Sequence, residues 1–298
     1  MKRVCQKTIT MLLVSFMCLS VCRTCYAAEK DEGENTNFTV YSPQFPEAYI
    51  VTEESAQNGD FAGNSQTDLG SITATVFVEE KYSYVNGQRV VTDSKLLSKD
   101  EVEAIGEENF GTLKSSAGSA NSRGKLKITF SGTHSYVGKG VSCNLKGNAS
   151  WSGFSTVYDS SKNPAVGKDF FGVAWAGGFS ASNSTCTATW NLGGSQNVYL
   201  SEAVPNAGRV YEFDEFANAA GKYMIYVKDV NLSTTLSKNV LNGGGNTAEA
   251  VLKYIHTYQT KTGSISISAS ASGVGAGFSL SNTSKQWNIS CVVNGIPY

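Results

Sequence analysis

Residues 141–151 run Val141-Ser142-Cys143-Asn144-Leu145-Lys146-Gly147-Asn148-Ala149-Ser150-Trp151, with an apolar or small side chain at every odd position and a polar one at every even position. Successive side chains of a β-strand point to opposite faces, so this alternation predicts a strand with one buried face and one wet face. The same pattern returns over residues 185–192, where the predicted apolar side is formed by Cys186, Ala188, Trp190 and Leu192. We therefore expect two half-buried strands.

The run between them, Phe170 to Ala176, contains no polar residue and predicts a strand that is covered on both faces. Asn86-Gly87 separates two β-rich runs, which is typical of a two-residue hairpin turn. The order Ser98-Lys99-Asp100-Glu101 is a capping box and predicts a short helix after Ser98. Residues 251–258 fit either a helix or a strand, and their β-branched and aromatic content favours a strand.

A second short helix is predicted from the helical spacing of four apolar residues, Phe213, Phe216, Ala217 and Ala220. The remaining pattern is that of about ten short strands with turn residues between them. We therefore predict an all-β protein, an antiparallel β-sandwich or partly closed barrel with one or two short helices.

The first 28 residues have the features of a secretory signal peptide of the bacterial type. Lys2, Arg3 and Lys7 precede a short apolar stretch, and the small residues Ala27 and Ala28 follow it. The apolar stretch is shorter than the roughly 20 residues that span a bilayer. We expect cleavage near Ala27 or Ala28 and a secreted, extracellular product.

Cleavage would change the charge of the chain, because the first 28 residues hold four of its 24 basic residues and none of its 25 acidic ones. A net charge near −5 then disfavours nucleic acid and anionic membrane surfaces as electrostatic partners. The acidic residues concentrate in residues 29–70, which show little periodicity, so a mobile lead segment is expected there. Residues 71–298 are expected to form a single β-sandwich-like domain.

Three cysteines stay in the mature chain, Cys143, Cys186 and Cys291. Each lies an even number of residues from a tryptophan in its own predicted strand, so all three are expected on apolar faces. One interpretation is that they are small hydrophobic residues of the core. The alternative is a disulfide between Cys143 and Cys186, which export would permit, with Cys291 left free.

His134 and His256 are the histidines of the chain and could serve as general bases, although a buried structural role is the more common one. Among the carboxylates, Glu212, Asp214, Glu215, Asp159 and Asp169 could form a glycosidase pair, and residues 159–169 could hold calcium. Charged surface positions explain these residues more simply. No recognised catalytic, phosphate-binding or zinc-binding motif occurs, so no cofactor or metal is expected.

The segment Ser264–Ser281 alternates apolar residues with serines and glycines and carries no charge. It resembles the uncharged, Ser-rich amphipathic hairpins that pore-forming toxins insert into membranes. Each arm is near the lower limit of about 9 residues for a spanning strand, and alanine and glycine form a poor lipid-facing band. An ordinary hairpin of the sandwich is therefore the favoured interpretation.

The sequence favours a secreted, non-enzymatic binding or surface-interaction module over an enzyme. Its partner would be an extracellular carbohydrate or protein, contacted by exposed aromatic side chains. The first alternative is a membrane-acting β-pore-type protein that uses the Ser264–Ser281 hairpin. The second is a hydrolase whose site forms from residues distant in sequence.

Overall fold

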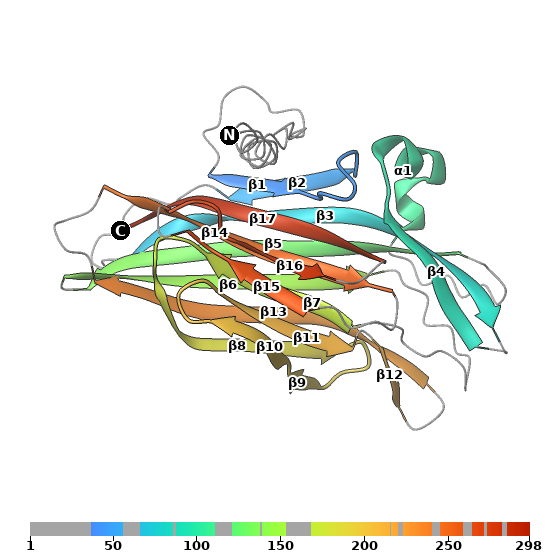
Figure 1. Cartoon of the computed structure of the whole chain (residues 1–298). Helices are drawn as coiled ribbons and strands as arrows, with labels where there is room; N and C mark the ends of the chain where they lie inside the picture. Colours follow the sequence, from blue (N-terminus) through green and yellow to red (C-terminus); the bar gives the residue numbers. More distant parts are fainter. Residues whose placement is uncertain are drawn as a thin grey trace, which may run out of the picture.

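The computed structural model describes residues 37–55, 66–85, 88–110, 121–137, 139–152, 168–214, 216–219, 223–239, 245–258, 264–270, 273–281 and 285–298. These residues form almost entirely antiparallel sheet, with long strands that run roughly along one axis of the molecule (Figure 1). The predicted signal peptide, residues 1–28, lies outside the described residues.

Two large sheets face each other across the core. The six-stranded sheet has the order β1 (Phe38–Tyr41), β17 (Gln286–Pro297), β14 (Thr247–Thr257), β7 (Lys168–Trp175), β11 (Gly208–Asp214) and β10 (Tyr199–Val204). The nine-stranded sheet has the order β2 (Ile50–Ser55), β3 (Gln66–Val85), β5 (Asn121–Val137), β6 (Gly140–Ser152), β13 (Tyr223–Asn239), β8 (Ser180–Trp190) and β9 (Ser195–Asn197), with β4 (Gln88–Leu96) paired to β3 and β12 (Phe216–Ala219) to β13. Neither order closes on itself in the described part of the chain, so the arrangement is that of a sandwich with open sheets.

Strand β6 confirms the alternation from which its structure was predicted. Its odd-numbered residues from Val141 to Trp151 are all buried, and its even-numbered ones are at least partly exposed. Strand β8 confirms the pattern through Cys186 and Ala188 but ends at Trp190, and Leu192 lies exposed in the turn that follows. The buried side chains of both strands contribute to the core between the sheets, in which Trp151, Trp175 and Trp287 are fully enclosed.

Strand β7 is covered on both faces, as its uninterrupted apolar run predicts. Phe171, Val173 and Trp175 point into the core between the sheets. Phe170 and Ala174 point outward and are covered by Phe278 and other residues of a two-stranded hairpin, β15 (Ser264–Ser268) and β16 (Gly277–Ser281). This hairpin is a third layer on the outside of the six-stranded sheet (Figure 1).

The helix α1 (Lys99–Ile105) begins with the predicted capping box, in which the side chains and backbones of Ser98 and Glu101 bond reciprocally. A 3₁₀ turn, η1 (Glu107–Asn109), follows it. The prediction of a second helix around Phe213 and Phe216 is wrong, because Phe213 lies in β11 and residues 216–219 form β12. Pairing with β7 and β13 prevails there over the helical spacing of the apolar residues.

Three other expectations concern strand boundaries. Residues 247–257 form a strand, as their β-branched content favours. Val85 pairs with Gln88, which confirms the hairpin around residues 86–87, although these two residues are not themselves described. Part of the segment 29–70, which was expected to be mobile, lies in strands: β1 pairs with β17, β2 pairs with β3, and β3 begins at Gln66. Residues 29–36 and 56–65 of that segment lie outside the described residues.

Candidate functional site

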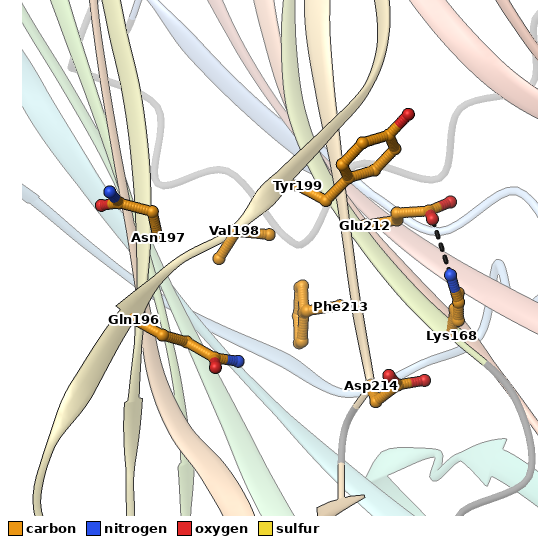
Figure 2. Close-up of a pocket in the computed structure, with 8 residues that line it drawn as sticks. All are labelled: Lys168, Gln196, Asn197, Val198, Tyr199, Glu212, Phe213 and Asp214. Carbon is orange, nitrogen blue, oxygen red and sulfur yellow. Dashed lines mark hydrogen bonds and ion pairs between the residues drawn. The ribbon is translucent and has the colours of Figure 1, made fainter.

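An open groove of about 480 Å³ lies where the end of the nine-stranded sheet meets β7, β10 and β11 of the six-stranded sheet (Figure 2). Its lining combines amide, carboxylate, ammonium and aromatic side chains. The lining residues are Lys168, Gln196, Asn197, Val198, Tyr199, Glu212, Phe213 and Asp214. The lining is more polar than that of most small-molecule pockets, so a ligand that bonds to several polar groups suits this groove better than an apolar one.

The groove exists because the chain changes sheets at Val198. The short strand β9 pairs with β8 in one sheet, and β10 pairs with β11 in the other. Val198 between them is buried, and its N–H donates to the carbonyl of Cys186 at 2.9 Å. This anchored crossing places Gln196 and Tyr199 on either side of the gap between the sheet edges.

The side chains that a ligand could contact differ in exposure. Tyr199 has 69% of its surface exposed, and Gln196 and Asn197 are also exposed. Phe213 is only 5% exposed and forms part of the floor. In Figure 2 the Gln196 side chain extends toward the same space as Phe213, whereas the Asn197 amide points away from it.

The charges in the groove are largely compensated. Lys168 Nζ lies 2.7 Å from Glu212 Oε1, and Ser201 Oγ donates to Glu212 Oε2 at 3.0 Å. The hydrogen bond to Glu212 raises the pKa of Lys168, so the ammonium stays charged. Glu212 is therefore a fixed acceptor held by two donors.

The structure brings together two of the five carboxylates that were considered for a glycosidase pair. Glu212 and Asp214 both line the groove, but Asp169 points to the opposite face of β7 and is fully buried. Glu215 and Asp159 lie outside the described residues, as does most of the 159–169 segment considered for calcium. The described part of the chain has no cluster of His, Cys, Asp and Glu side chains that could hold a metal ion.

His256 lies in a buried polar cluster at the end of the sandwich core. Its Nδ1 lies 3.1 and 3.2 Å from the two carboxylate oxygens of Asp169, and its Nε2 lies 3.1 Å from Glu80 Oε1. Carboxylate oxygens accept, so both ring nitrogens must donate if both carboxylates are ionised. The geometry therefore holds the His256 ring between two buried carboxylates, with one ring nitrogen facing each.

The same cluster connects the two sheets. Tyr254 donates its hydroxyl hydrogen to Asp169 and accepts a hydrogen bond from Trp151 Nε1 at 2.8 Å, and the Thr257 N–H donates to Asp169 Oδ1 at 3.0 Å. Glu80 and Trp151 come from the nine-stranded sheet, whereas Asp169, Tyr254 and His256 come from the six-stranded one. The five residues are at most 2% exposed, and none of them lines the groove. His256 is therefore buried between the two sheets and bonded to a carboxylate from each of them.

His134 is a separate residue with a different environment. His134 on β5 pairs with Cys143 on β6. Leu126 on β5 pairs with Trp151, which belongs to the His256 cluster, and it lies about 27 Å along the strand from His134. Its Nδ1 has no hydrogen-bond partner in the described part of the structure, and burial lowers the pKa of its imidazole. The structure does not bring His134 and His256 together. His134 does not line the groove and is not part of the buried cluster around His256.

The disulfide considered as an alternative between Cys143 and Cys186 is not formed in the structure. Strand β13 lies between β6 and β8, and Cys143 pairs with Leu236 whereas Cys186 pairs with Leu232. The two thiols and Cys291 are free and buried, and burial raises the pKa of each to about 12. They are small hydrophobic residues of the core, which was the other interpretation.

Sequence reasoning missed Glu80, Gln196, Asn197 and Tyr199. Glu80 could have been found, because it continues the buried parity of Ile72, Ala74, Val76 and Val78 on one strand. A carboxylate at a predicted core position calls for a buried partner. Gln196, Asn197 and Tyr199 had no such signal, because their position depends on the crossing between sheets.

No known protein-family model matches the sequence, and no curated protein is significantly similar to it. Among solved structures, the chain is similar to the collagen adhesin (CNA) from S. aureus, with 11% identity over 71% of this chain and 86% of that chain. The TM-score of 0.22 is too low for this similarity to support an argument about fold or function. In the described residues, no helix has the length and hydrophobicity needed to cross a membrane.

Proposed function

We propose that this protein is a secreted, non-enzymatic binding module that recognises an uncharged carbohydrate in the groove between β9, β10, β11 and β7. The observation that carries the proposal is the exposed Tyr199 ring in a groove that the exposed amide of Gln196 also lines. These side chains are held at the edge of a rigid, fully packed sandwich.

The chemistry of the groove suits a sugar. The apolar face of a pyranose ring can pack on an exposed tyrosine, whose ring loses little conformational entropy on binding. Amide groups donate and accept, and carboxylates accept, so Gln196 and Asp214 can bond to sugar hydroxyls. This pairing of an aromatic platform with convergent polar groups favours a carbohydrate over an apolar ligand.

The electrostatics favour an uncharged ligand. Lys168 is the cation among the lining residues, and Glu212 already neutralises it. Asp214 adds a further carboxylate to the same groove. An anionic sugar would therefore meet no uncompensated positive charge and would be disfavoured.

The proposal places the protein outside the cell. The features of residues 1–28 support export through a signal peptide, with cleavage near Ala27 or Ala28. An extracellular module would meet glycans of cell surfaces and matrices, which accords with a groove that is open to solvent and has no enclosed reaction space.

The experiment is a glycan array probed with the exported chain, with Tyr199→Ala and with Tyr136→Ala. Tyr136 is the matched control, because it is also an exposed tyrosine, at 51%, but lies on β5 away from the groove. The expected result is binding of neutral oligosaccharides by the wild type and by Tyr136→Ala, with loss of the signal in Tyr199→Ala. Absence of glycan binding by the wild type, or equal binding by Tyr199→Ala, would overturn the proposal.

A second candidate function rests on the β15–β16 hairpin. Its strands pair with each other and with neither large sheet, and the whole Ser264–Ser281 segment is uncharged. Its apolar face packs on the six-stranded sheet, and the serines of β15 are exposed. Such a hairpin could leave the sheet and insert its apolar face into a lipid bilayer, which would make the protein membrane-acting.

Dye release from liposomes tests this second candidate with two matched variants. Ala276→Asp places a charge on the face that packs on the sheet, and Ser266→Asp places the same charge on the exposed face. Membrane insertion predicts leakage with the wild type and Ser266→Asp, and loss of leakage with Ala276→Asp. No leakage by the wild type over several lipid compositions and pH values would exclude this candidate.

A further inference from the structure

The outer face of the nine-stranded sheet carries serine, threonine and asparagine side chains in matched register. One row crosses six adjacent strands, from β3 through β5, β6, β13 and β8 to β9. Its members are Thr73, Thr129, Asn148, Asn231, Thr187 and Asn197, all uncharged and all at least partly exposed. Such a row offers hydroxyl and amide groups at the strand spacing of about 4.8 Å.

Hydrogen bonds hold members of this row in place. Thr73 Oγ1 and Thr129 Oγ1 lie 3.0 Å apart. Asn148 Nδ2 donates to Asn231 Oδ1 at 2.9 Å and to the Val230 carbonyl at 3.3 Å. Side chains already fixed by such bonds lose less entropy when a ligand contacts them.

A second hollow, of about 340 Å³, lies over the middle of the row. Four of its lining residues are members of the row, Thr129, Asn148, Asn231 and Thr187. The others are Ser131, Lys146, Gly147, Thr185, Leu232 and Ser233. Lys146 is the charged residue among them, and the hydroxyl and amide groups of the other polar lining residues could bond to an uncharged polar ligand.

The row connects the hollow with the groove. Asn197 is the last member of the row, where it pairs with Thr187 on β8, and it also lines the groove. Figure 2 shows its amide on the opposite side of β9 from that of Gln196, which places it toward the outer face. From Asn197 to Asn148 the path crosses three strand spacings, about 14 Å.

We infer that the ligand is a chain of uncharged sugars rather than a single one. One part of it would occupy the groove at Tyr199, and the chain would continue past Asn197 to the hollow at Asn231 and Asn148. This inference rests on the proposed function and adds to it the length of the ligand and its direction across the sheet.

The test is titration calorimetry with neutral oligosaccharides of one linkage type, from disaccharide to hexasaccharide, chosen by the array. Asn231→Ala removes an amide in the middle of the path, and Thr187→Val removes a hydroxyl there with little change of shape. Asn144→Ala is the matched control, because Asn144 lies on the same face of β6 about 14 Å from Asn148 and outside the hollow.

The expected result is at least tenfold tighter binding of the hexasaccharide than of the disaccharide by the wild type and by Asn144→Ala. Asn231→Ala and Thr187→Val should lose that gain and keep the wild-type affinity for the disaccharide. Affinity that does not depend on length, or equal behaviour of Asn231→Ala and Asn144→Ala, would overturn the inference while Tyr199-dependent binding still supports the groove. Absence of all oligosaccharide binding would instead reject the proposed function itself.

Discussion

Lys168 and Asp169 are neighbours on β7, yet their side chains lie in two opposite environments. Lys168 points outward into the open groove and pairs with Glu212, whereas Asp169 points inward and is held by His256, Tyr254 and the Thr257 N–H. The first pair is partly exposed and borders the open groove in which the ligand is proposed to bind. The second cluster is buried from solvent, and its side chains are hydrogen-bonded to one another between the two sheets.

The comparison separates residues that stabilise the fold from residues that can bind. A partly exposed ion pair contributes little to stability because water screens it and competes for its groups. In a buried cluster, removal of one partner lowers the stability of the fold strongly, because it leaves a buried charge without a compensating group. Chemically reactive residue types are therefore no guide to function in this protein unless their exposure is also considered.

The largest effect is expected for His256→Leu. The variant leaves the buried carboxylates of Glu80 and Asp169 without the ring nitrogens that face them, which should lower the free energy of unfolding by about 3–5 kcal/mol. Urea denaturation of wild type and variant measures it. His134→Leu is the control, because His134 lies in no ionic cluster and should change stability much less. Equal stability of His256→Leu and wild type would show that the cluster is not needed to hold the sheets together.

An intermediate effect is expected for Lys253, which lies under the hairpin on the outer face of the six-stranded sheet. Its ammonium donates to the Phe278 carbonyl at 2.6 Å, and burial lowers the pKa of Lys253 to about 8. Below pH 8 the Lys253 amine is protonated in both the folded and the unfolded chain, so the burial of its charge lowers the stability of the fold by its full amount. Above that pH the folded chain loses the proton while the unfolded chain keeps it, so this residue's contribution to stability rises.

The pH dependence is measured by denaturation of wild type and Lys253→Met between pH 7 and 9. The wild type should gain stability relative to Lys253→Met as the pH rises through 8. The cysteines, whose thiol pKa values are raised to about 12, act equally on both proteins and cancel in the difference. A constant difference across this range would mean that the Lys253 ammonium is not buried as described.

The smallest effect on stability is expected for Lys168→Met in the groove. The Lys168 side chain is 41% exposed, so loss of its bond to Glu212 should change the free energy of unfolding by at most about 1 kcal/mol. The same denaturation assay measures it. A loss as large as that of His256→Leu would remove the distinction between the two sides of β7.

Much of the fold could be predicted from side-chain parity alone. Alternation along β6 and the uninterrupted apolar run of β7 correctly indicated which faces are buried. The failures arose where pairing partners matter more than local pattern. Phe216 and Ala217 have helical spacing but pair with β13, and the acidic β2 is ordered because it pairs with β3 through its backbone.

The candidate site was less accessible to such reasoning. Parity places Glu80, Asp169 and His256 on core faces, but only the sheet order shows that the three meet. The order β6–β13–β8 likewise separates Cys143 from Cys186, which no spacing in the sequence reveals. Tyr199 and Gln196 come together because Val198 carries the chain from one sheet to the other, a property of the assembled sandwich.

The most direct measurement is a calorimetric titration of the tightest-binding array oligosaccharide into the wild type and into Tyr199→Ala. Loss of the exposed ring should weaken binding at least tenfold, equivalent to about 1.4 kcal/mol, and leave the melting temperature unchanged. That result would assign recognition to the groove. The same affinity for both proteins would contradict it and would show that the open side of β7 is not where the ligand binds.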